Sequence, residues 1–489
     1  MMGWRSVLVL AASGTAVCGI ATGGAALAAV HGHRGPAVTA APAWGGTAPL
    51  PGLDSLDKGK SAAPEALSCP SAGACVIGGS YTDASGRTQA FVAGEKNGAW
   101  GPAGEIPGSA ALNTGGNAVV TSVSCPAPGD CAAAGQYSPG GRADGGTDAP
   151  AAEAFVAMEH DGRWGRATPL RGLAAKNKGK SAGAAAVSCW APGDCTVAGT
   201  YAPGARGRAL ITQAFTAGAR NGTWGAAVPL TGLAALNTAG QAQVTALSCA
   251  PVRRGATGGN CAVGGKYGSA AGTEAFIAQA TRGTWAAARE FPGTAARNTA
   301  GAAGVSSLSC PAAGDCAAAG SYAYKTARGT ESGTGFVADS RDGKWDTPQT
   351  VPGTGDVISC GAPGDCEAGG TYFPGRRAGA FTAAETRGRW AGPKSVPGLP
   401  GGSGGVGAIS CPAAGECGAG GSYSAASAPA RGFVAVRHGG RWSGAHQASA
   451  AGAGDAAVTL MSCTKALACT AAGYDDSGSG VFVMSTTGR

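Results

Sequence analysis

Charged residues are scarce in this chain of 489 residues, because Asp, Glu, Lys and Arg together make up only 13% of it. The formal net charge of +8 is not gathered into any block of Lys and Arg. Proteins that bind nucleic acids need a basic stripe to neutralise phosphates, with aromatic side chains on which bases stack. Neither feature is present in the sequence, so we expect no nucleic-acid partner.

Histidine is also rare, with five residues in the chain and none that recurs with the repeated cysteines. Copper and zinc sites depend on His ligands or on closely grouped Cys ligands. No Ser/His/Asp grouping, phosphate-binding loop or pair of opposed carboxylates stands out either. We therefore expect no metal, no cofactor and no catalytic residues. The alternative interpretation is a carbohydrate-active enzyme of glycosidase or sialidase type.

Long apolar runs are absent after the first residues. Residues 1–28 contain Arg5, an apolar run from Val7 to Val17 and the ending Ala26-Leu27-Ala28, a pattern typical of a cleaved secretory signal peptide. Small polar residues interrupt the run, which is too short to cross about 30 Å of hydrocarbon. We expect an extracellular protein without a membrane span, in which residues 29–43 form a flexible linker rich in Ala, Pro and His.

Cysteine, in contrast, is abundant and regularly placed. The chain has 17 Cys, of which Cys18 lies in the expected signal peptide, and the others form eight pairs. Seven pairs enclose five residues, and the fourth carries an insertion. An even set of cysteines in an exported chain indicates disulfides. The expected pairs are Cys69–Cys75, Cys125–Cys131, Cys189–Cys195, Cys249–Cys261, Cys310–Cys316, Cys360–Cys366, Cys411–Cys417 and Cys463–Cys469.

Each pair belongs to a repeated unit, which also contains one Tyr, one Phe and one Trp at fixed places. The units consist of short runs of β-forming residues bounded by Gly, Pro and Asp turns, which predicts four antiparallel strands per unit. Because each aromatic ring recurs at one position per unit, we expect the rings to fill a repeated core. They are Tyr81, Tyr137, Tyr201, Tyr267, Tyr322, Tyr372, Tyr423 and Tyr474; Phe91, Phe155, Phe215, Phe276, Phe336, Phe381, Phe433 and Phe482; and Trp44, Trp100, Trp164, Trp224, Trp285, Trp345, Trp390 and Trp442.

The two ends of the chain complement one another. The last unit stops at Arg489 without its Trp strand, whereas residues 44–53 match residues 224–233 in register. A closed β-propeller joins its ends in this way, while an open solenoid needs capping repeats. The sequence therefore predicts an all-β fold: an eight-bladed β-propeller over residues 44–489, with one hairpin disulfide per blade and the N-terminal strand closing the last blade.

The repeat has the pattern S-C-x5-C-x-A-x-G-x-Y, then A-F-V-A, then G-x-W-G. It resembles secreted actinobacterial repeat proteins of the broad kelch, galactose-oxidase central domain and Asp-box propeller group. The resemblance covers nearly all of the expected mature chain and implies the propeller fold. It implies no particular activity, because propellers host enzymes and binding modules alike. The turn before each Trp is one residue shorter than an Asp-box, which argues against a sialidase.

Few aromatic residues fall outside the repeat. Two of them lie just past the second-strand Tyr of neighbouring units, in loops that also carry basic residues, and a third replaces the turn proline after Cys189. The predicted binding residues are Tyr324, Lys325, Phe373, Arg376, Arg377 and Trp190. Ordinary loop packing is the alternative. We interpret the chain as a monomeric binding or scaffold module at the bacterial cell exterior, with a polysaccharide or a surface protein as its partner.

The connections between units are uneven. Five carry an Asn or Asp at one place, whereas those after Trp345, Trp390 and Trp442 lack it. Asn tolerates left-handed turns and caps its own loop, so we expect a structural role. These connections and the loops between second and third strands should lie on one face of the propeller, with one sector built differently. The five residues are Asp57, Asn113, Asn177, Asn237 and Asn298.

Overall fold

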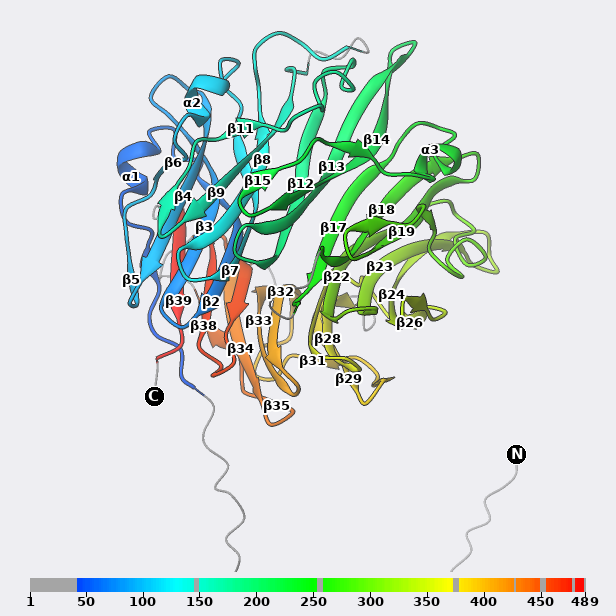
Figure 1. Cartoon of the computed structure of the whole chain (residues 1–489). Helices are drawn as coiled ribbons and strands as arrows, with labels where there is room; N and C mark the ends of the chain where they lie inside the picture. Colours follow the sequence, from blue (N-terminus) through cyan, green and yellow to red (C-terminus); the bar gives the residue numbers. More distant parts are fainter. Residues whose placement is uncertain are drawn as a thin grey trace, which may run out of the picture. The chain divides into compact units, whose positions relative to one another are not determined.

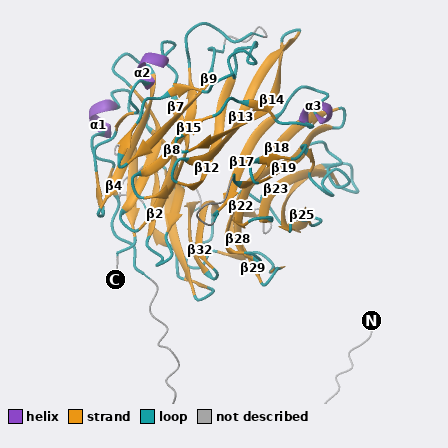
Figure 2. Cartoon of the chain, in the orientation of Figure 1, coloured by secondary structure: helices purple, strands orange, loops and turns teal. Residues whose placement is uncertain are grey.

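A computed structural model describes residues 42–144, 149–252, 258–372, 378–425, 428–448, 454–476 and 480–487. These residues form eight antiparallel sheets, and Figures 1 and 2 show that strands make up most of them. Each sheet is one propeller blade, in which consecutive strands pair in chain order. The predicted all-β propeller of eight blades is confirmed.

The first four blades have the following strands. Blade 1 contains β2 (Ala63–Ser71), β3 (Ala74–Thr82), β4 (Thr88–Lys96), β5 (Ala99–Trp100) and β6 (Gly104–Glu105). Blade 2 contains β7 (Val119–Ala127), β8 (Asp130–Tyr137), β9 (Glu153–His160), β10 (Arg163–Trp164) and β11 (Thr168–Pro169). Blade 3 contains β12 (Ala182–Ala191), β13 (Asp194–Arg206), β14 (Ala209–Arg220), β15 (Thr223–Trp224) and β16 (Val228–Pro229). Blade 4 contains β17 (Gln243–Ala250), β18 (Asn260–Ser269), β19 (Gly272–Thr281), β20 (Thr284–Trp285) and β21 (Arg289–Glu290).

The other four blades follow the same order. Blade 5 contains β22 (Ala303–Ala312), β23 (Asp315–Lys325), β24 (Glu331–Arg341), β25 (Lys344–Trp345) and β26 (Gln349–Val351). Blade 6 contains β27 (Val357–Ala362), β28 (Asp365–Tyr372), β29 (Gly379–Thr386), β30 (Arg389–Trp390) and β31 (Lys394–Ser395). Blade 7 contains β32 (Ser403–Ala413), β33 (Glu416–Ser424), β34 (Arg431–His438), β35 (Arg441–Trp442) and β36 (His446–Gln447). Blade 8 contains β37 (Ala456–Cys463), β38 (Cys469–Asp475), β39 (Gly480–Ser485) and β1 (Ala48–Pro49).

The fourth strand of a blade is divided into two short pieces. In blade 3, β15 pairs with Ala219 and Arg220 of β14, and β16 pairs farther along with Phe215 and Thr216. Three one-turn helices lie in connections between blades: α1 (Leu53–Leu56), α2 (Ser109–Leu112) and α3 (Leu233–Leu236). No helix in the described part of the chain is long and apolar enough to cross a membrane.

The N-terminal strand completes blade 8. Strand β1 pairs with β39, with Ala48 opposite Val483 and Pro49 opposite Phe482, and Trp44 bridges to Thr486. The sheet therefore has the order β1-β39-β38-β37, which joins the two ends of the propeller in one blade. The predicted closure is confirmed.

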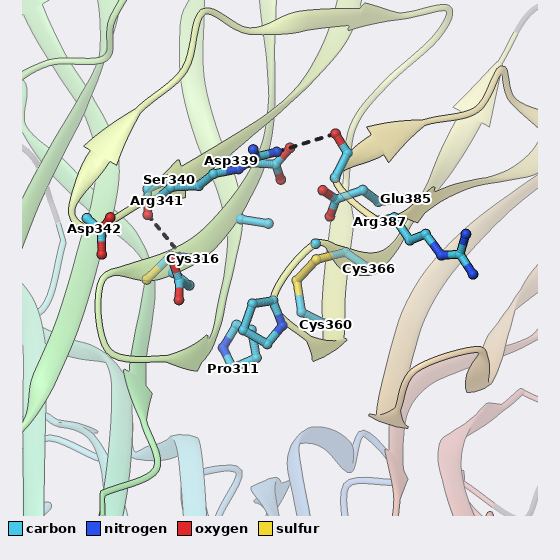
Figure 3. A pocket seen from close by; sticks show the side chains of 15 residues that line it. Pro311, Cys316, Asp339, Ser340, Arg341, Asp342, Cys360, Cys366, Glu385 and Arg387 are labelled. Atoms are coloured by element: carbon cyan, nitrogen blue, oxygen red, sulfur yellow. Dashed lines mark hydrogen bonds between the residues drawn. A yellow bond between two sulfur atoms is a disulfide. The ribbon is translucent and has the colours of Figure 1, made fainter.

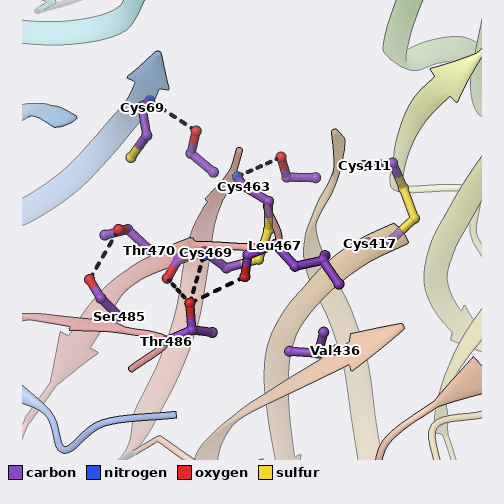
Figure 4. The surroundings of a disulfide bond; sticks show 12 residues. Cys69, Cys411, Cys417, Val436, Cys463, Leu467, Cys469, Thr470, Ser485 and Thr486 are labelled. Atoms are coloured by element: carbon purple, nitrogen blue, oxygen red, sulfur yellow. Dashed lines mark hydrogen bonds between the residues drawn. A yellow bond between two sulfur atoms is a disulfide. The ribbon is translucent and has the colours of Figure 1, made fainter. Parts of the chain in front are cut away.

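A ring of identical hydrogen bonds joins each blade to the next. The Ser before the first cysteine of a blade accepts a bond from the backbone N–H of the first cysteine in the next blade, at 2.9 to 3.0 Å. The eighth bond runs from Cys69 N–H to Ser462 Oγ and closes the ring between the last and first blades (Figure 4). The Ser-Cys dipeptide of the repeat thus has a role that the sequence analysis did not assign.

All eight predicted disulfides are formed, each joining the first and second strands of one blade. They lie at the ends of the blades that carry the first-to-second and third-to-fourth turns, which we call the disulfide face. We call the opposite ends, with the connections between blades, the loop face. Eight disulfides are typical of a protein that folds in an oxidising, extracellular compartment.

The repeated Phe residues form the deepest part of the core, because all eight side chains are exposed by 2% or less. The second-strand Gly of each unit makes room for this ring. A Cβ on Gly135 would lie 2.0 Å from the carbonyl oxygen of Val119 and 2.8 Å from the Phe155 ring. The expectation that Phe fills a repeated core is confirmed, and the constant Gly of the repeat follows from it.

Candidate functional site

The connections that carry Asn act as clamps between neighbouring blades on the loop face. The Asn113 side chain is 1% exposed; its Oδ1 accepts from the N–H of Asn117 at 2.7 Å, and its Nδ2 donates to Thr88 O in blade 1 at 2.9 Å. The equivalent residues Asn177, Asn237 and Asn298 bond their own loop and the preceding blade in the same way. The expected loop-capping role is confirmed and extends to joining adjacent blades.

These connections also cover the repeated Tyr of the blade that follows them. In the connection to blade 4, Leu230 and Leu233 pack in one cluster with Tyr267. In the connection to blade 1, Leu50 and Leu53 likewise pack in one cluster with Tyr81. The Tyr residues of blades 1 to 5 are consequently buried: Tyr81 at 3%, Tyr137 at 6%, Tyr201 at 6%, Tyr267 at 3% and Tyr322 at 6% exposure.

The connections into blades 6 and 7 lack the helical turn and leave the Tyr rings partly uncovered. Tyr372 and Tyr423 are half-buried, and Tyr474 of blade 8 is 39% exposed. Residues 352–356 and 396–402 are the short connections that precede blades 6 and 7. The expectation that the Tyr rings fill the core is therefore met only in part in this sector, where Tyr372 and Tyr423 pack against their core clusters but stay half-buried. Full burial also requires the apolar residues of a longer connection, such as Leu230 and Leu233 before blade 4 and Phe291 before blade 5.

A groove of about 270 Å³ lies between the Tyr rings of blades 6 and 7. Tyr372 and Tyr423 line it together with Ser395, Leu399 and Pro400, and backbone of several glycines completes the wall. Tyr372 Oη and Ser395 Oγ form a hydrogen bond of 2.6 Å, which fixes the first ring. Aromatic faces beside hydroxyls and accessible backbone can stack against the apolar face of a sugar and bond its hydroxyls.

The structure describes three of the six predicted binding residues, Tyr324, Lys325 and Trp190. Tyr324, at the end of β23, is half-buried against the core of blade 5. Lys325 is exposed beside it, and its N–H donates to Thr299 Oγ1 at 2.8 Å. Phe373, Arg376 and Arg377 lie outside the described residues.

Trp190 lies at the disulfide face, at the opposite end of the blades from Tyr324. It is half-buried and packs against Cys249, Cys261 and Ala280 of blade 4. This contact accounts for its burial without a ligand. A role in sugar stacking stays a prediction for Trp190, as do the binding roles of the five loop residues.

A pair of facing carboxyl groups occupies a second cavity, of about 380 Å³, between blades 5 and 6 on the disulfide face. Asp339 comes from β24 and Glu385 from β29, on facing strands beside the Cys360–Cys366 disulfide (Figure 3). Trp390 Nε1 donates to Asp339 Oδ2 at 2.8 Å. Burial, and then the adjacent Asp339, raises the pKa of Glu385 to about 8, and burial also raises the pKa of Asp339.

The carboxyl pair does not make a convincing metal site. Asp339, Glu385 and Cys366 bring their ligand atoms within 4.8 Å of one another. Cys366 is bonded to Cys360 and offers no thiolate, and the nearby Arg341 guanidinium opposes a cation. Two carboxyl groups alone leave most of the coordination sphere of a divalent ion unfilled. The arrangement is better described as a pair of largely buried carboxyl groups at the contact between two blades.

The raised pKa of Glu385 predicts how the stability of the protein depends on pH. The pKa of Glu385 is raised from 4.5 to about 8 in the folded protein, so folding takes up a proton between these pH values. Stability is therefore fully present below pH 4.5 and falls as the pH rises towards 8, because unfolding then releases this proton. We expect Glu385→Gln to flatten this decline in urea unfolding measured from pH 5 to 9.

The control for the pH prediction is Glu331→Gln, because Glu331 is an exposed residue of β24. This variant should keep the pH dependence of the unaltered protein. A Glu385→Gln protein whose stability declines with pH as steeply as before would contradict the raised pKa of Glu385.

Comparison with known proteins finds no matching family model, and no curated protein matches either. Among solved structures, an ulvan lyase is 12% identical with a TM-score of 0.40, over 92% of this chain and 94% of that chain. Sqt1 of Chaetomium thermophilum, bound to the N-terminus of the ribosomal protein L10, is 12% identical with a TM-score of 0.40, over 75% and 87%. A subtype N10 neuraminidase-like protein of A/little yellow-shouldered bat/Guatemala is 9% identical with a TM-score of 0.36, over 62% and 94%. Likenesses this distant give no information about function.

The sequence analysis did not find two features of the site. The partial exposure of Tyr372 and Tyr423 follows from the short connections that precede them. In the sequence, the loss of Asn from these connections indicated that they differ from the others. Glu385 occupies a strand position that is Glu95 in blade 1 and Glu159 in blade 2, but Ala219 in blade 3 and Ala280 in blade 4. Comparing strand positions between units would therefore not have singled it out, because its distinguishing neighbour, Asp339, lies in the adjacent blade.

Proposed function

We propose that this protein is a secreted module that binds polysaccharide at the cell exterior through the groove between Tyr372 and Tyr423. The observation that carries the proposal is the selective uncovering of the Tyr rings in the sector with short connections. These rings are buried in five other blades, so their exposure is not required by the propeller. A partly exposed Tyr is a stiff, amphipathic surface that binds sugars at a low entropic cost.

Export is the second part of the proposal. It is supported by the eight disulfides of the described chain and by the signal-like pattern of residues 1–28. Residues 29–43 would then link the cleavage site to the propeller. We further propose that the mature protein is a monomer, and that its origin is actinobacterial, as the repeat pattern suggests.

The carboxyl pair gives little support to the alternative function, a glycosidase. Glycosidases hold their two carboxyl groups about 5 Å or more apart, on opposite sides of the bond that they cleave. Asp339 and Glu385 have oxygens within 4.8 Å of one another, in a cavity lined by a disulfide, and burial raises the pKa of both groups, which disfavours the ionised carboxylate that this chemistry needs. We therefore favour binding over hydrolysis.

The test is binding of the mature protein to a panel of purified cell-wall and plant polysaccharides, with an assay for released sugar in parallel. Tyr423→Ala should weaken binding about 10-fold, which corresponds to about 1.4 kcal/mol for one stacked ring. Tyr474→Ala is the matched control, because this exposed Tyr does not line the groove. Tyr324→Ala and Phe373→Ala test the residues predicted from sequence.

Each outcome of this screen has a distinct meaning. Binding that is lost in Tyr423→Ala and kept in Tyr474→Ala supports the proposal. Binding that is lost only in Tyr324→Ala would place the site at the end of β23 in blade 5, and binding lost only in Phe373→Ala would place it in the segment after β28 of blade 6. Released sugar would establish an enzyme and contradict the proposal, and a failure to bind any polysaccharide would direct the search to a surface protein.

A further inference from the structure

A second cleft on the loop face, of about 490 Å³, lies among blades 2, 3 and 4. It is larger than the Tyr groove, and the first residues of β12 and β17 line it, which places it at the inner ends of these blades. Its wall consists of Ala, Gly, Ser, Thr and Val244 together with a few longer polar side chains. None of the described residues that line the cleft is aromatic.

Four long polar side chains line this cleft. Gln136 lies at the end of β8, Gln243 begins β17 directly opposite Lys266 of β18, and Gln241 precedes β17. Within the described residues, none of these four side chains has a hydrogen bond or ion pair. Gln241, Gln243 and Lys266 are exposed, and Gln136 is half-buried. Three amides and one ammonium are therefore available to a ligand in one cleft.

The fold does not require these side chains. Gln136 and Lys266 stand one residue before the repeated Tyr of their blades, where the other blades have short side chains or none. Those residues are Ser80, Thr200, Ser321, Thr371, Ser422 and Gly473. The strand position opposite Lys266 is Gln243 in blade 4, and the equivalent position in blades 3 and 5 is Gly183 and Gly304. The cleft is thus built from departures from the repeat.

The charge of the cleft selects its ligand. Lys266 is the single charged residue among the described residues that line it, and neither Asp nor Glu takes part. An ammonium group in such a setting favours a negative group, and primary amides bond hydroxyl and ring oxygens in either direction. Without stacking rings, a nucleotide base has no surface on which to bind. The remaining chemistry is that of a sugar that carries an acidic group.

We propose that this cleft binds an acidic sugar residue, with Lys266 facing its carboxylate or sulfate and the three Gln amides bonding its hydroxyls. This inference rests on the proposed polysaccharide-binding function and specifies its ligand as an acidic polysaccharide. Neutral polymers would keep the hydroxyl contacts with the three amides and with the Tyr groove, and would lose only the contact with Lys266.

The test compares three polymers by calorimetry with the mature protein: polygalacturonate, the same polymer with its carboxyl groups reduced to alcohols, and dextran sulfate. We expect the acidic form to bind at least 5-fold more tightly than its reduced form. Lys266→Gln should remove this difference while leaving the affinity for the reduced polymer unchanged. Lys178→Gln is the control, because Lys178 is an exposed lysine of the connection before blade 3 that does not line the cleft.

The sulfated polymer distinguishes the two acidic groups. Loss of polygalacturonate binding alone in Lys266→Gln assigns the cleft to a carboxylate, and loss of dextran sulfate binding alone assigns it to a sulfate. Equal affinity for the acidic and reduced polymers, or an unchanged affinity in Lys266→Gln, would overturn the inference. If the inference fails in this way but Tyr423→Ala still weakens binding of the reduced polymer, the proposed function stands. If no polymer binds at all, the proposed function fails and the inference fails with it.

Discussion

Removal of residues 42–53 from the mature protein is expected to lower its melting temperature by about 5–10 °C. This segment supplies β1, the outer strand of blade 8, and the leucines that cover Tyr81 of blade 1. Leu50 and Leu53 are 3% and 4% exposed, and full burial of a Leu is worth about 1.5–3 kcal/mol. Loss of several kcal/mol together with an open sheet edge accounts for the expected shift.

The control for this deletion is the chain that begins at Pro42, which keeps β1 and should melt like the mature protein. A synthetic peptide of residues 42–53, added to the shortened chain, should restore part of the lost stability by pairing with β39. An unchanged melting temperature after the deletion would contradict closure of the propeller by its N-terminal strand.

Substitution of Arg437 by Leu is expected to cost about 3–5 kcal/mol of unfolding free energy. Arg437 of blade 7 pairs with Glu367 of blade 6 at 3.1 Å, and the two side chains are 9% and 1% exposed. Trp442 Nε1 also donates to Glu367 Oε1 at 3.3 Å. Removing the guanidinium would leave a carboxylate buried without its counter-charge, which is the costly half of a broken buried ion pair.

A double substitution distinguishes this cause from simple loss of packing. Glu367→Gln combined with Arg437→Leu removes both charges and keeps an amide oxygen for the Trp442 N–H. We expect it to recover most of the stability that Arg437→Leu loses, measured by urea unfolding at pH 7. Arg389→Leu on the exposed end of blade 6 is the control and should change stability little. A double variant as unstable as Arg437→Leu would show that the side chain acts through its volume.

The propeller was predictable from sequence because every blade repeats the same residues. Eight Cys pairs and eight sets of rings fixed the number of blades, and residues 44–53 showed how the ends join. The Ser–Cys ring was visible as a constant Ser and yet had no assigned role, because its partner lies in the next blade. Contacts of this kind depend on how blades stack, which a single unit of the repeat does not contain.

The candidate sites were less predictable, since they consist of departures from the repeat. The sequence analysis searched for additional aromatic residues and found Tyr324 and Phe373. The structure instead draws attention to Tyr372 and Tyr423, which belong to the repeat and are only half-buried because a neighbouring loop is short. Lys266 was hidden for another reason: one lysine at a strand position carries no motif, and its meaning depends on the polar groups that adjacent blades bring to it.

The central claim is that a polysaccharide binds on the loop face between blades 6 and 7. Hydrogen exchange of the full mature chain, with and without an oligosaccharide of the polymer found in the screen, tests it most directly. We predict slower exchange in residues 396–404, whose backbone lines the groove beside Tyr423, and no change at the turns of the disulfide face. Slower exchange confined to the disulfide face, with residues 396–404 unaffected, would contradict the claim.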